Sequence, residues 1–251
     1  MRLLIFGLGY SARAIAARLS GWDVQATGSA GTLAFDDRAG VETAIERATH
    51  ILSSVPPGEG DPVLSAYGEA LGRSGAWLGY LSSAGVYGDT GGAWVDESAP
   101  IRGRRANRNA ADAEWLATGA RVFRLPGIYG PGRSPLDRVR DGKAHRTGVA
   151  GQVFSRIHVE DLASGVIAGF DAPDGAYNLA DDMPVSQDSV IKFASELLGL
   201  APPPVVPLEM LSPKARAFHA ENRRVANGKA KRVLGWRPVY ANYRLGLRAL
   251  V

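Results

Sequence analysis

The sequence predicts an α/β fold of the Rossmann type, a doubly wound parallel sheet with a smaller C-terminal lobe. The apolar run at residues 3–6 passes directly into a glycine turn, and the turn passes into a pattern of helical spacing. Strand-like and helix-like segments then alternate, as in a parallel sheet with helices on both faces. With 251 residues, 45% hydrophobic and 22% charged, the chain can form one globular unit with a substantial core.

The first third of the chain is expected to alternate strands and helices in regular order. Strands are predicted at residues 3–6, 22–27, 33–35 and 50–55, with helices at 12–19 and 41–48. Gly21 ends the first helical pattern, and Pro56 with Pro57 stops the fourth strand. Asp61 and Pro62 form a cap and first-turn pair for a helix that reaches residue 71.

The alternation continues to about residue 130 and then loosens. A strand is predicted at 76–81, a helix at 106–118 and a strand at 121–125, and later helices at 134–140, 159–170, 187–198 and 243–251. We expect residues 1–130 to form a dinucleotide-binding Rossmann core and residues 131–251 a smaller substrate-side lobe, interleaved with the core in one compact unit. Ligands in such folds bind at the carboxyl edge of the sheet.

The composition excludes several classes of site. The chain has no cysteine, so it has no disulfide framework, thiolate nucleophile or cysteine-based zinc site. Its four histidines are isolated from one another and lack spaced carboxylate partners, so we expect no metal site. No apolar stretch approaches the roughly 18 residues of a membrane span, and the opening run is too short for a signal peptide. A cytoplasmic protein with no membrane partner is the simplest expectation.

The turn after the first strand carries the pattern Gly7-x-Gly9-x-x-Ala12, which suits a dinucleotide. In this pattern the first glycine makes the turn, the second lets the backbone approach a pyrophosphate, and the helix end supplies N–H donors. The alternative is a tight structural turn. The cofactor-binding residues predicted here are Gly7, Gly9, Tyr10, Ser11, Ala12 and Arg13.

The end of the second strand favours NADP over NAD. An acid at this point would accept hydrogen bonds from the ribose of NAD, but the sequence reads Ala26-Thr27-Gly28-Ser29. The hydroxyls of Thr27 and Ser29, with Arg13 or Arg38, could receive a 2′-phosphate instead; alternatively, both arginines are solvated helix-face charges. Asp36 could meet the adenine edge or be a turn residue.

Several short motifs, in order along nearly the whole chain, resemble the extended short-chain dehydrogenase/reductase family of NAD(P)-dependent epimerases and dehydratases, which act mainly on nucleotide sugars. They lie at residues 82–89, 95–97, 124–132, 157–163, 177–180 and 234–236. The resemblance implies that Ser83 hydrogen-bonds the reacting oxygen of the substrate. Further cofactor contacts are expected at the ends of strands, from Ser54, Val55, Pro56, Ser82 and Pro126.

The family's acid-base pair is missing. The resemblance places a Tyr-x-x-x-Lys pair near residues 106–111, but the sequence there is Ala-Asn-Arg-Asn-Ala-Ala. The chain therefore resembles the atypical members of the superfamily. Arg108 could replace the electrostatic role of the lysine, although a guanidinium is a poor proton donor. Tyr87 and Tyr129 are the candidates for a relocated acid. By the same resemblance, His158 steadies the fold, and Asp161 is expected to be a hydrogen-bond acceptor at a helix start.

The net charge of +4 is unevenly distributed. Residues 212–251 carry ten basic residues, Lys214 among them, and one acid, whereas residues 1–211 are mildly acidic. Val225, Val233, Leu234 and Trp236 interleave these charges as an amphipathic helix would, so a solvated face or a site for an anionic substrate is favoured over nucleic acid.

Two functions follow as hypotheses. The first is an NAD(P)-dependent oxidoreductase or epimerase that acts on a carbonyl or alcohol of a small or nucleotide-linked substrate, using Ser83 and a non-standard proton donor. The alternative is a catalytically inactive NADP(H)-binding sensor or interaction protein. A homodimer is compatible with either.

Overall fold

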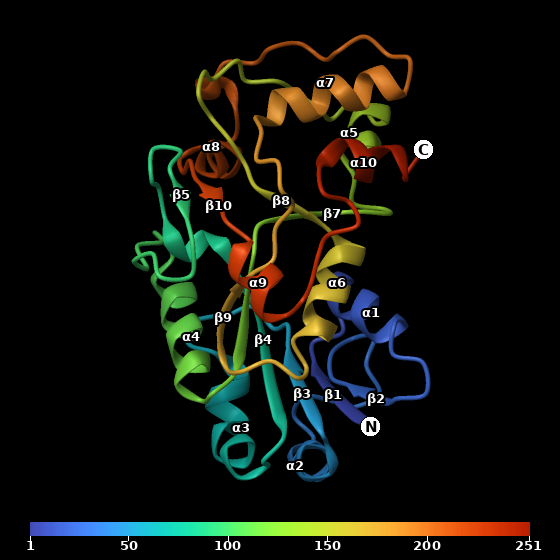
Figure 1. Ribbon diagram of the computed structural model, residues 1–251, viewed down its shortest axis with the longest axis vertical. Coiled ribbons are helices and arrows are strands. Elements are labelled where there is room, and N and C mark those ends of the chain that lie inside the picture. Colours follow the sequence, from blue (N-terminus) through green and yellow to red (C-terminus); the bar gives the residue numbers. More distant parts are fainter.

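A computed structural model describes all of residues 1–251 except Lys214 and Phe218 and contains a six-stranded parallel sheet (Figure 1). The strand order is β2-β1-β3-β4-β6-β9. The strands are β1 (Arg2–Phe6), β2 (Asp23–Ala26), β3 (His50–Ser53), β4 (Trp77–Ser83), β6 (Arg121–Leu125) and β9 (Gly175–Asn178). All five pairings are parallel, which confirms the predicted doubly wound α/β fold.

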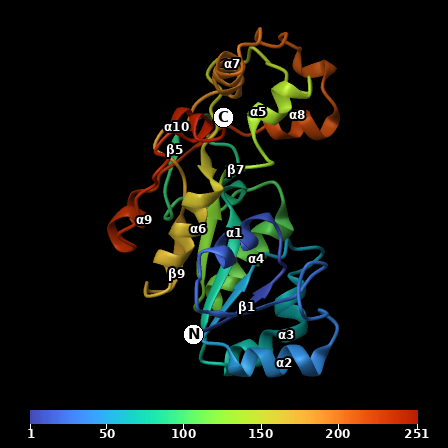
Figure 2. The same cartoon turned by 90° about the vertical axis from the view of Figure 1, so that its right-hand side faces the viewer.

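Helices cover both faces of the sheet (Figure 2). On one face lie α1 (Tyr10–Ala17) and α6 (Val159–Ala168), whose apolar residues share a core with Leu3 and Ile5 of β1. On the other face lie α2 (Arg38–Arg47), α3 (Pro62–Arg73) and α4 (Ala106–Ala117), which share a core with Leu4 and Phe6. Successive side chains of a strand point to opposite faces, so a continuous apolar strand supplies both cores.

The C-terminal lobe lies beyond the carboxyl ends of the strands (Figure 1). Its helices α5 (Pro135–Arg140), α7 (Gln187–Leu197) and α10 (Tyr243–Arg248) enclose a third core that contains Leu136, Phe193 and Leu247. The remaining elements are β5 (Trp94–Val95), β7 (Gly127–Tyr129), β8 (Arg156–His158), β10 (Arg224–Val225), η1 (Ala84–Tyr87), η2 (Leu208–Met210), α8 (Pro213–His219) and α9 (Gly228–Val233). β7 pairs with β8 and β5 pairs with β10, so distant segments meet above the sheet.

Two predictions of local structure are wrong. Residues 33–35 do not form a strand; Leu33 makes one isolated bridge to Thr27, and Phe35 packs edge-on against Tyr67. The segment is too short to form a ladder because Asp37 caps α2 directly after it. Residues 225–236 are not one amphipathic helix either, since Val225 pairs with Val95 in a strand and α9 ends at Val233. Lys214 of the basic stretch lies outside the described residues.

Candidate functional site

The glycine turn after β1 packs against the residues that follow β2 and β3 on one side, and it is open on the other. Gly7 has a φ of +83°, and a Cβ built on it would stand 3.0 Å from Val55 Cγ2. Its N–H donates to Thr27 Oγ1 at 3.2 Å, and the Ser54 hydroxyl donates to its carbonyl. Gly9 differs, because no described atom lies within 4 Å of a Cβ built there. The ends of β2 and β3 therefore fix a loop whose front can be approached closely by a ligand.

This loop fits the pyrophosphate of a dinucleotide. Helix α1 begins at Tyr10 with Gly9 as its N-cap, and no side chain caps the first turn. The first N–H groups of a helix have no partner within it, so those of Tyr10, Ser11 and Ala12 lie at an uncapped, positively polarised end. An anion beside an open glycine and a free helix end is the arrangement that dinucleotide-binding folds use.

The side chains predicted for the adenosine end have different surroundings. Thr27 is buried and its hydroxyl already accepts from Gly7, so it supports the loop. Arg38 pairs with Glu42 on the surface of α2, as the alternative for this arginine foresaw. Arg13 and Ser29 are exposed, and no hydrogen bond or ion pair of the Arg13 guanidinium occurs among the described residues. Asp36 is exposed in the turn before α2.

The side chain of Ser82, a predicted cofactor contact, is directed into the interior of the protein. Its hydroxyl is buried and donates to Asp112 Oδ2 of α4 at 2.6 Å. Asp112 Oδ1 also accepts a hydrogen bond from Arg124 Nη2 of β6 at 2.7 Å, and the two side chains form a buried ion pair. Because neighbouring residues of a strand point to opposite faces, Ser82 turns inward where Ser83 turns outward.

Tyr87 belongs to the same buried network. Its hydroxyl donates to Asn178 Oδ1 at 2.7 Å and accepts from Arg124 Nη1 at 3.1 Å. Burial raises the pKa of Tyr87 above its ordinary value. The hydroxyl is thus committed to the interior, and these contacts favour a structural role over the predicted role of proton donor.

Tyr129 is also buried, and its ring lines the cavity described below. Its hydroxyl has no hydrogen-bond partner among the described residues and would stand 2.0 Å from a Cβ on Gly246 of α10. Burial, with the negative charges of Asp181 and Asp161, raises the pKa of Tyr129 far above its usual range. A tyrosine that donates a proton in catalysis needs the opposite shift, so the geometry does not favour this role.

His158 and Asp161 occupy structural positions. His158 is the N-cap of α6, where its ring accepts from the N–H of Glu160. Asp161 accepts from the N–H groups of Val239 and Tyr240 at 2.8 and 2.9 Å and so joins α6 to the C-terminal segment. Both contacts agree with the structural roles given to these residues on the sequence.

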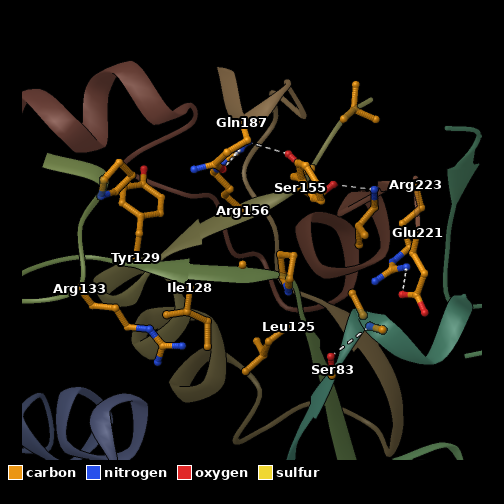
Figure 3. A pocket seen from close by; sticks show the side chains of 18 of the residues that line it. Ser83, Leu125, Ile128, Tyr129, Arg133, Ser155, Arg156, Gln187, Glu221 and Arg223 are labelled. Atoms are coloured by element: carbon orange, nitrogen blue, oxygen red, sulfur yellow. Dashed lines mark hydrogen bonds and ion pairs between the residues drawn. The ribbon is translucent and has the colours of Figure 1, made fainter. Parts of the chain in front are cut away.

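A cavity of about 690 Å³ opens at the carboxyl end of β4 (Figure 3). Its lining extends from Ser83 and Gly85 past Pro126 to β8 and the start of α7. Six arginines line it, against the acids Asp137, Asp141 and Glu221; they are Arg104, Arg105, Arg133, Arg138, Arg156 and Arg223. The excess of positive charge suits an anionic ligand.

Two guanidinium groups and the Ser83 hydroxyl lie close to Gly85. Gly85 N–H donates to Ser83 Oγ at 3.0 Å, which leaves the hydroxyl proton free to donate to a ligand. A Cβ built on Gly85 would stand 3.1 Å from Ser83 Oγ, 3.4 Å from Arg105 Nη2 and 3.8 Å from Arg223 Nη2. Arg223 is anchored by the Gly88 carbonyl and by Glu221, each at 2.7 Å. A hydrogen-bond donor and two positive charges therefore converge on one point.

Arg108, named on the sequence as an arginine that could replace the electrostatic role of the lysine, is not one of these groups. Its guanidinium donates to the Tyr80 hydroxyl at 3.1 Å. Arg105, the residue before α4, takes the place beside Ser83 instead. No sequence signal separates Arg105 from the neighbouring arginines, because the difference depends on where the helix begins.

The glycine turn and the cavity are in contact. Tyr10 donates through its hydroxyl to the Pro131 carbonyl at 3.1 Å, and the Arg133 guanidinium lies over the Tyr10 ring at 5.7 Å. Arg133 also lines the cavity. A dinucleotide on the turn would thus have its far end near Ser83, at the carboxyl edge of the sheet.

Comparison with solved structures places the chain in a family. A conserved protein of unknown function from Silicibacter pomeroyi is 41% identical, with a TM-score of 0.88, over 99% of this chain and 97% of its own. This chain belongs to the family of that protein. The human epimerase family protein SDR39U1, solved with NADPH, has a TM-score of 0.81 at 16% identity, over 100% and 99% of the two chains. MoeE5, solved with UDP-glucuronic acid and NAD, has a TM-score of 0.77 at 21% identity, over 99% and 97%.

The fold is therefore that of the extended short-chain dehydrogenases/reductases, as the sequence motifs predicted. Among curated proteins, a Streptomyces 3-diazoavenalumate denitrifying reductase is 26% identical over 61% of this chain. Protein YeeZ of Escherichia coli is 32% identical over 49% of this chain. The matches span only 58% and 47% of the lengths of these two relatives. No family model matches the sequence.

None of the helices among the described residues is both long and apolar enough to cross a membrane. No group of three or more candidate metal-ligating side chains occurs in the same part of the chain.

Proposed function

We propose that the protein is an NAD(P)-dependent oxidoreductase that acts on a carbonyl or alcohol of an anionic substrate. The observation that carries this proposal is the cavity that begins at Ser83, touches the glycine turn through Arg133, and is lined by six arginines. A hydride-transferring cofactor and an anionic substrate would meet at the carboxyl edge of the sheet, where such folds bind their ligands.

The reacting end would lie at Ser83. A bound nicotinamide cofactor supplies or accepts a hydride at the substrate carbon. The Ser83 hydroxyl would donate a hydrogen bond to the substrate oxygen and keep its own proton, while its oxygen is held by the N–H of Gly85. Arg105 and Arg223 place positive charge beside the same oxygen and stabilise the negative charge that develops there during reduction. Glu221 and the Gly88 carbonyl hold Arg223 in place.

The proton would come from solvent rather than from a side chain. Guanidinium groups remain charged and are poor donors, and the hydroxyls of Tyr87 and Tyr129 are directed away from Ser83. Stabilisation of the oxyanion thus replaces the tyrosine-lysine pair of typical family members.

NADP is the proposed cofactor. β2 ends without an acid, and Arg13 is an exposed guanidinium without a partner among the described residues, available for a 2′-phosphate. The solved relatives hold NADPH in one case and NAD in another, so the fold accepts both. The substrate is proposed to be small or nucleotide-linked, as is the UDP-glucuronic acid bound by MoeE5.

The test is turnover of NADPH and NADH by the purified protein with a panel of carbonyl compounds that carry a phosphate, diphosphate or carboxylate. Ser83→Ala should reduce kcat/KM by about 10²-fold and leave NADPH affinity unchanged. Ser98→Ala, at an exposed serine bonded to Asp96, is the matched control. Turnover that is equal in the Ser83→Ala variant and the wild type would contradict the assignment.

A second candidate function is an NADP(H) sensor without turnover. The observation that favours it is that no tyrosine hydroxyl or lysine stands beside Ser83 in the described residues. It predicts that NADPH and NADP bind with different affinities, or change association into a homodimer, while no substrate is converted. Equal affinities with no change in association would count against it.

A further inference from the structure

Arg156 lies at the end of the cavity opposite Ser83 (Figure 3). It is the first residue of β8, and only 6% of it is exposed. Its guanidinium donates to the carbonyls of Phe154 and Val185 at 2.8 and 3.1 Å, and to Gln187 Oε1 at 3.0 Å. Gln187 is the first residue of α7, so two elements of the C-terminal lobe bring these side chains together.

The charge of Arg156 has no direct counter-ion. No carboxylate of the described residues lies within ion-pair distance of it, and its three acceptors are all uncharged. Burial lowers the pKa of Arg156 to about 10, which still leaves it protonated at neutral pH. Asp181 attracts it from a distance, but burial raises the pKa of Asp181 to about 7, so that carboxyl is only partly ionised. Burying an unpaired cation of this kind costs free energy unless a ligand supplies the opposite charge.

Arg156 and Gln187 both have hydrogen-bond donors that their contacts with the protein do not use. A guanidinium carries five N–H groups, and Arg156 uses three of them in the contacts above. The amide oxygen of Gln187 accepts from Arg156, so its amide nitrogen is left to donate to a ligand. Figure 3 shows the two side chains meeting above the cavity.

We propose that Arg156 and Gln187 form a subsite that binds a carboxylate group of the substrate, at the opposite end of the cavity from the reacting oxygen. This proposal rests on the proposed function, since it places the reaction at Ser83. The substrate class is then a carbonyl or alcohol compound that carries a carboxylate at its far end.

The surroundings favour a carboxylate over a phosphate. A planar carboxylate matches the fork of the guanidinium and carries one negative charge for the one positive charge of Arg156. A phosphate dianion would bring a second negative charge to a buried site whose own side chains, Arg156 and Gln187, supply one positive charge. The second charge would therefore remain uncompensated.

The experiment titrates the full-length protein with succinate and, separately, with inorganic phosphate, by calorimetry in the presence of saturating NADP. Succinate should bind to the wild type, and Arg156→Gln should weaken it about 10- to 100-fold, the loss expected for charge-assisted hydrogen bonds. Arg73→Gln is the matched control, because Arg73 lies outside the cavity on α3, where its exposed side chain pairs with Glu69. It should change succinate affinity less than threefold.

A second variant covers the case in which Arg156→Gln does not fold. Gln187→Glu places a carboxylate on Arg156 from within the chain, so it should abolish succinate binding without lowering Tm. Unchanged succinate affinity in either folded variant would overturn the subsite, and so would phosphate binding that exceeds succinate binding and depends on Arg156. These titrations need no turnover, so a failure of the Ser83→Ala test would refute the proposed reaction while leaving the outcome of the titrations intact.

Discussion

Arg124 of β6 and Asp112 of α4 form an ion pair at 2.7 Å in which the side chains are only 4% and 1% exposed. Ser82 donates to the same carboxylate, and Tyr87 accepts from the same guanidinium. Four side chains from β4, η1, α4 and β6 thus meet directly behind Ser83. The network fixes the end of β4 and the turn that follows it, and so positions the Ser83 hydroxyl in the cavity.

Removal of one partner of this pair should be strongly destabilising. Asp112→Ala leaves the Arg124 guanidinium buried without a counter-ion, so we expect the free energy of unfolding to fall by about 3–5 kcal/mol. Urea unfolding followed by circular dichroism measures it. The control is Glu69→Ala, which breaks an exposed pair with Arg73 and should cost at most about 0.5 kcal/mol. A loss of under about 1 kcal/mol in Asp112→Ala would show that the network does not hold β4.

The sequence predicted those elements whose signals are local. The glycine turn, the apolar runs of the central strands and the Asp61-Pro62 helix start depend on neighbouring residues, and Asp61 does accept from the N–H groups of Val63 and Leu64. Strands of two or three residues, such as β5, β7 and β10, could not be predicted, because they form only when a distant segment pairs with them. The strand predicted at residues 33–35 was wrong because these residue types favour a strand but no neighbouring segment pairs with them beyond one isolated bridge.

The candidate site, too, was predictable only in the parts that depend on local motifs. Ser83 and the glycine turn follow from short motifs, whereas the arginines of the cavity come from segments as far apart as Arg105, Arg156 and Arg223. Neighbouring side chains of a strand point in opposite directions, so the side chains of Ser82 and Ser83 could not face the same side of β4. The orientation of the Tyr87 hydroxyl depends on Arg124 and Asn178, and no local pattern encodes that contact.

Tyr129→Phe should leave turnover within about twofold of the wild type. The hydroxyl that it removes is buried without a partner among the described residues, so stability should stay the same or rise by up to about 1 kcal/mol. Steady-state kinetics and urea unfolding measure the two effects. A fall in kcat of about 10²-fold, with the fold intact, would instead identify Tyr129 as the proton donor.

Gly246→Ala provides a structural control for the same contact. A Cβ there would stand 2.0 Å from the Tyr129 hydroxyl and 2.8 Å from Cζ of the ring, so the variant should lose about 1–3 kcal/mol of stability. In the Tyr129→Phe background part of this loss should be recovered, because the closest atom is gone. Equal losses in both backgrounds would show that the clash lies elsewhere.

Arg13→Ala should weaken binding of NADPH relative to NADH by about tenfold, the range of a lost charge-assisted hydrogen bond to a phosphate. Fluorescence titration of each cofactor measures the ratio. Arg38→Ala is the matched control, because Arg38 already pairs with Glu42 at 2.9 Å, and it should change the ratio less than twofold. If the two variants behave alike, the selectivity for NADPH does not come from Arg13.

Asp181 should make stability fall as pH rises towards neutrality. Burial raises its pKa from 3.8 to about 7, so the folded protein holds this proton more tightly than the unfolded chain. The stabilising contribution of the protonated form is complete below about pH 4, is lost progressively up to about pH 7, and then stays constant. Asp181→Asn removes the titration and keeps an oxygen for the N–H of Met183. The free energy of unfolding of this variant should equal that of the wild type near pH 4 and exceed it at pH 8 by up to about 4 kcal/mol, the full difference for a three-unit shift.

Urea unfolding across this pH range measures the difference for Asp181→Asn, with Asp23→Asn, at an exposed pair with Arg2, as the control. Parallel pH curves for Asp181→Asn and the wild type would mean that Asp181 is ionised in the folded protein, and the charge of Arg156 would then already be compensated from within the chain.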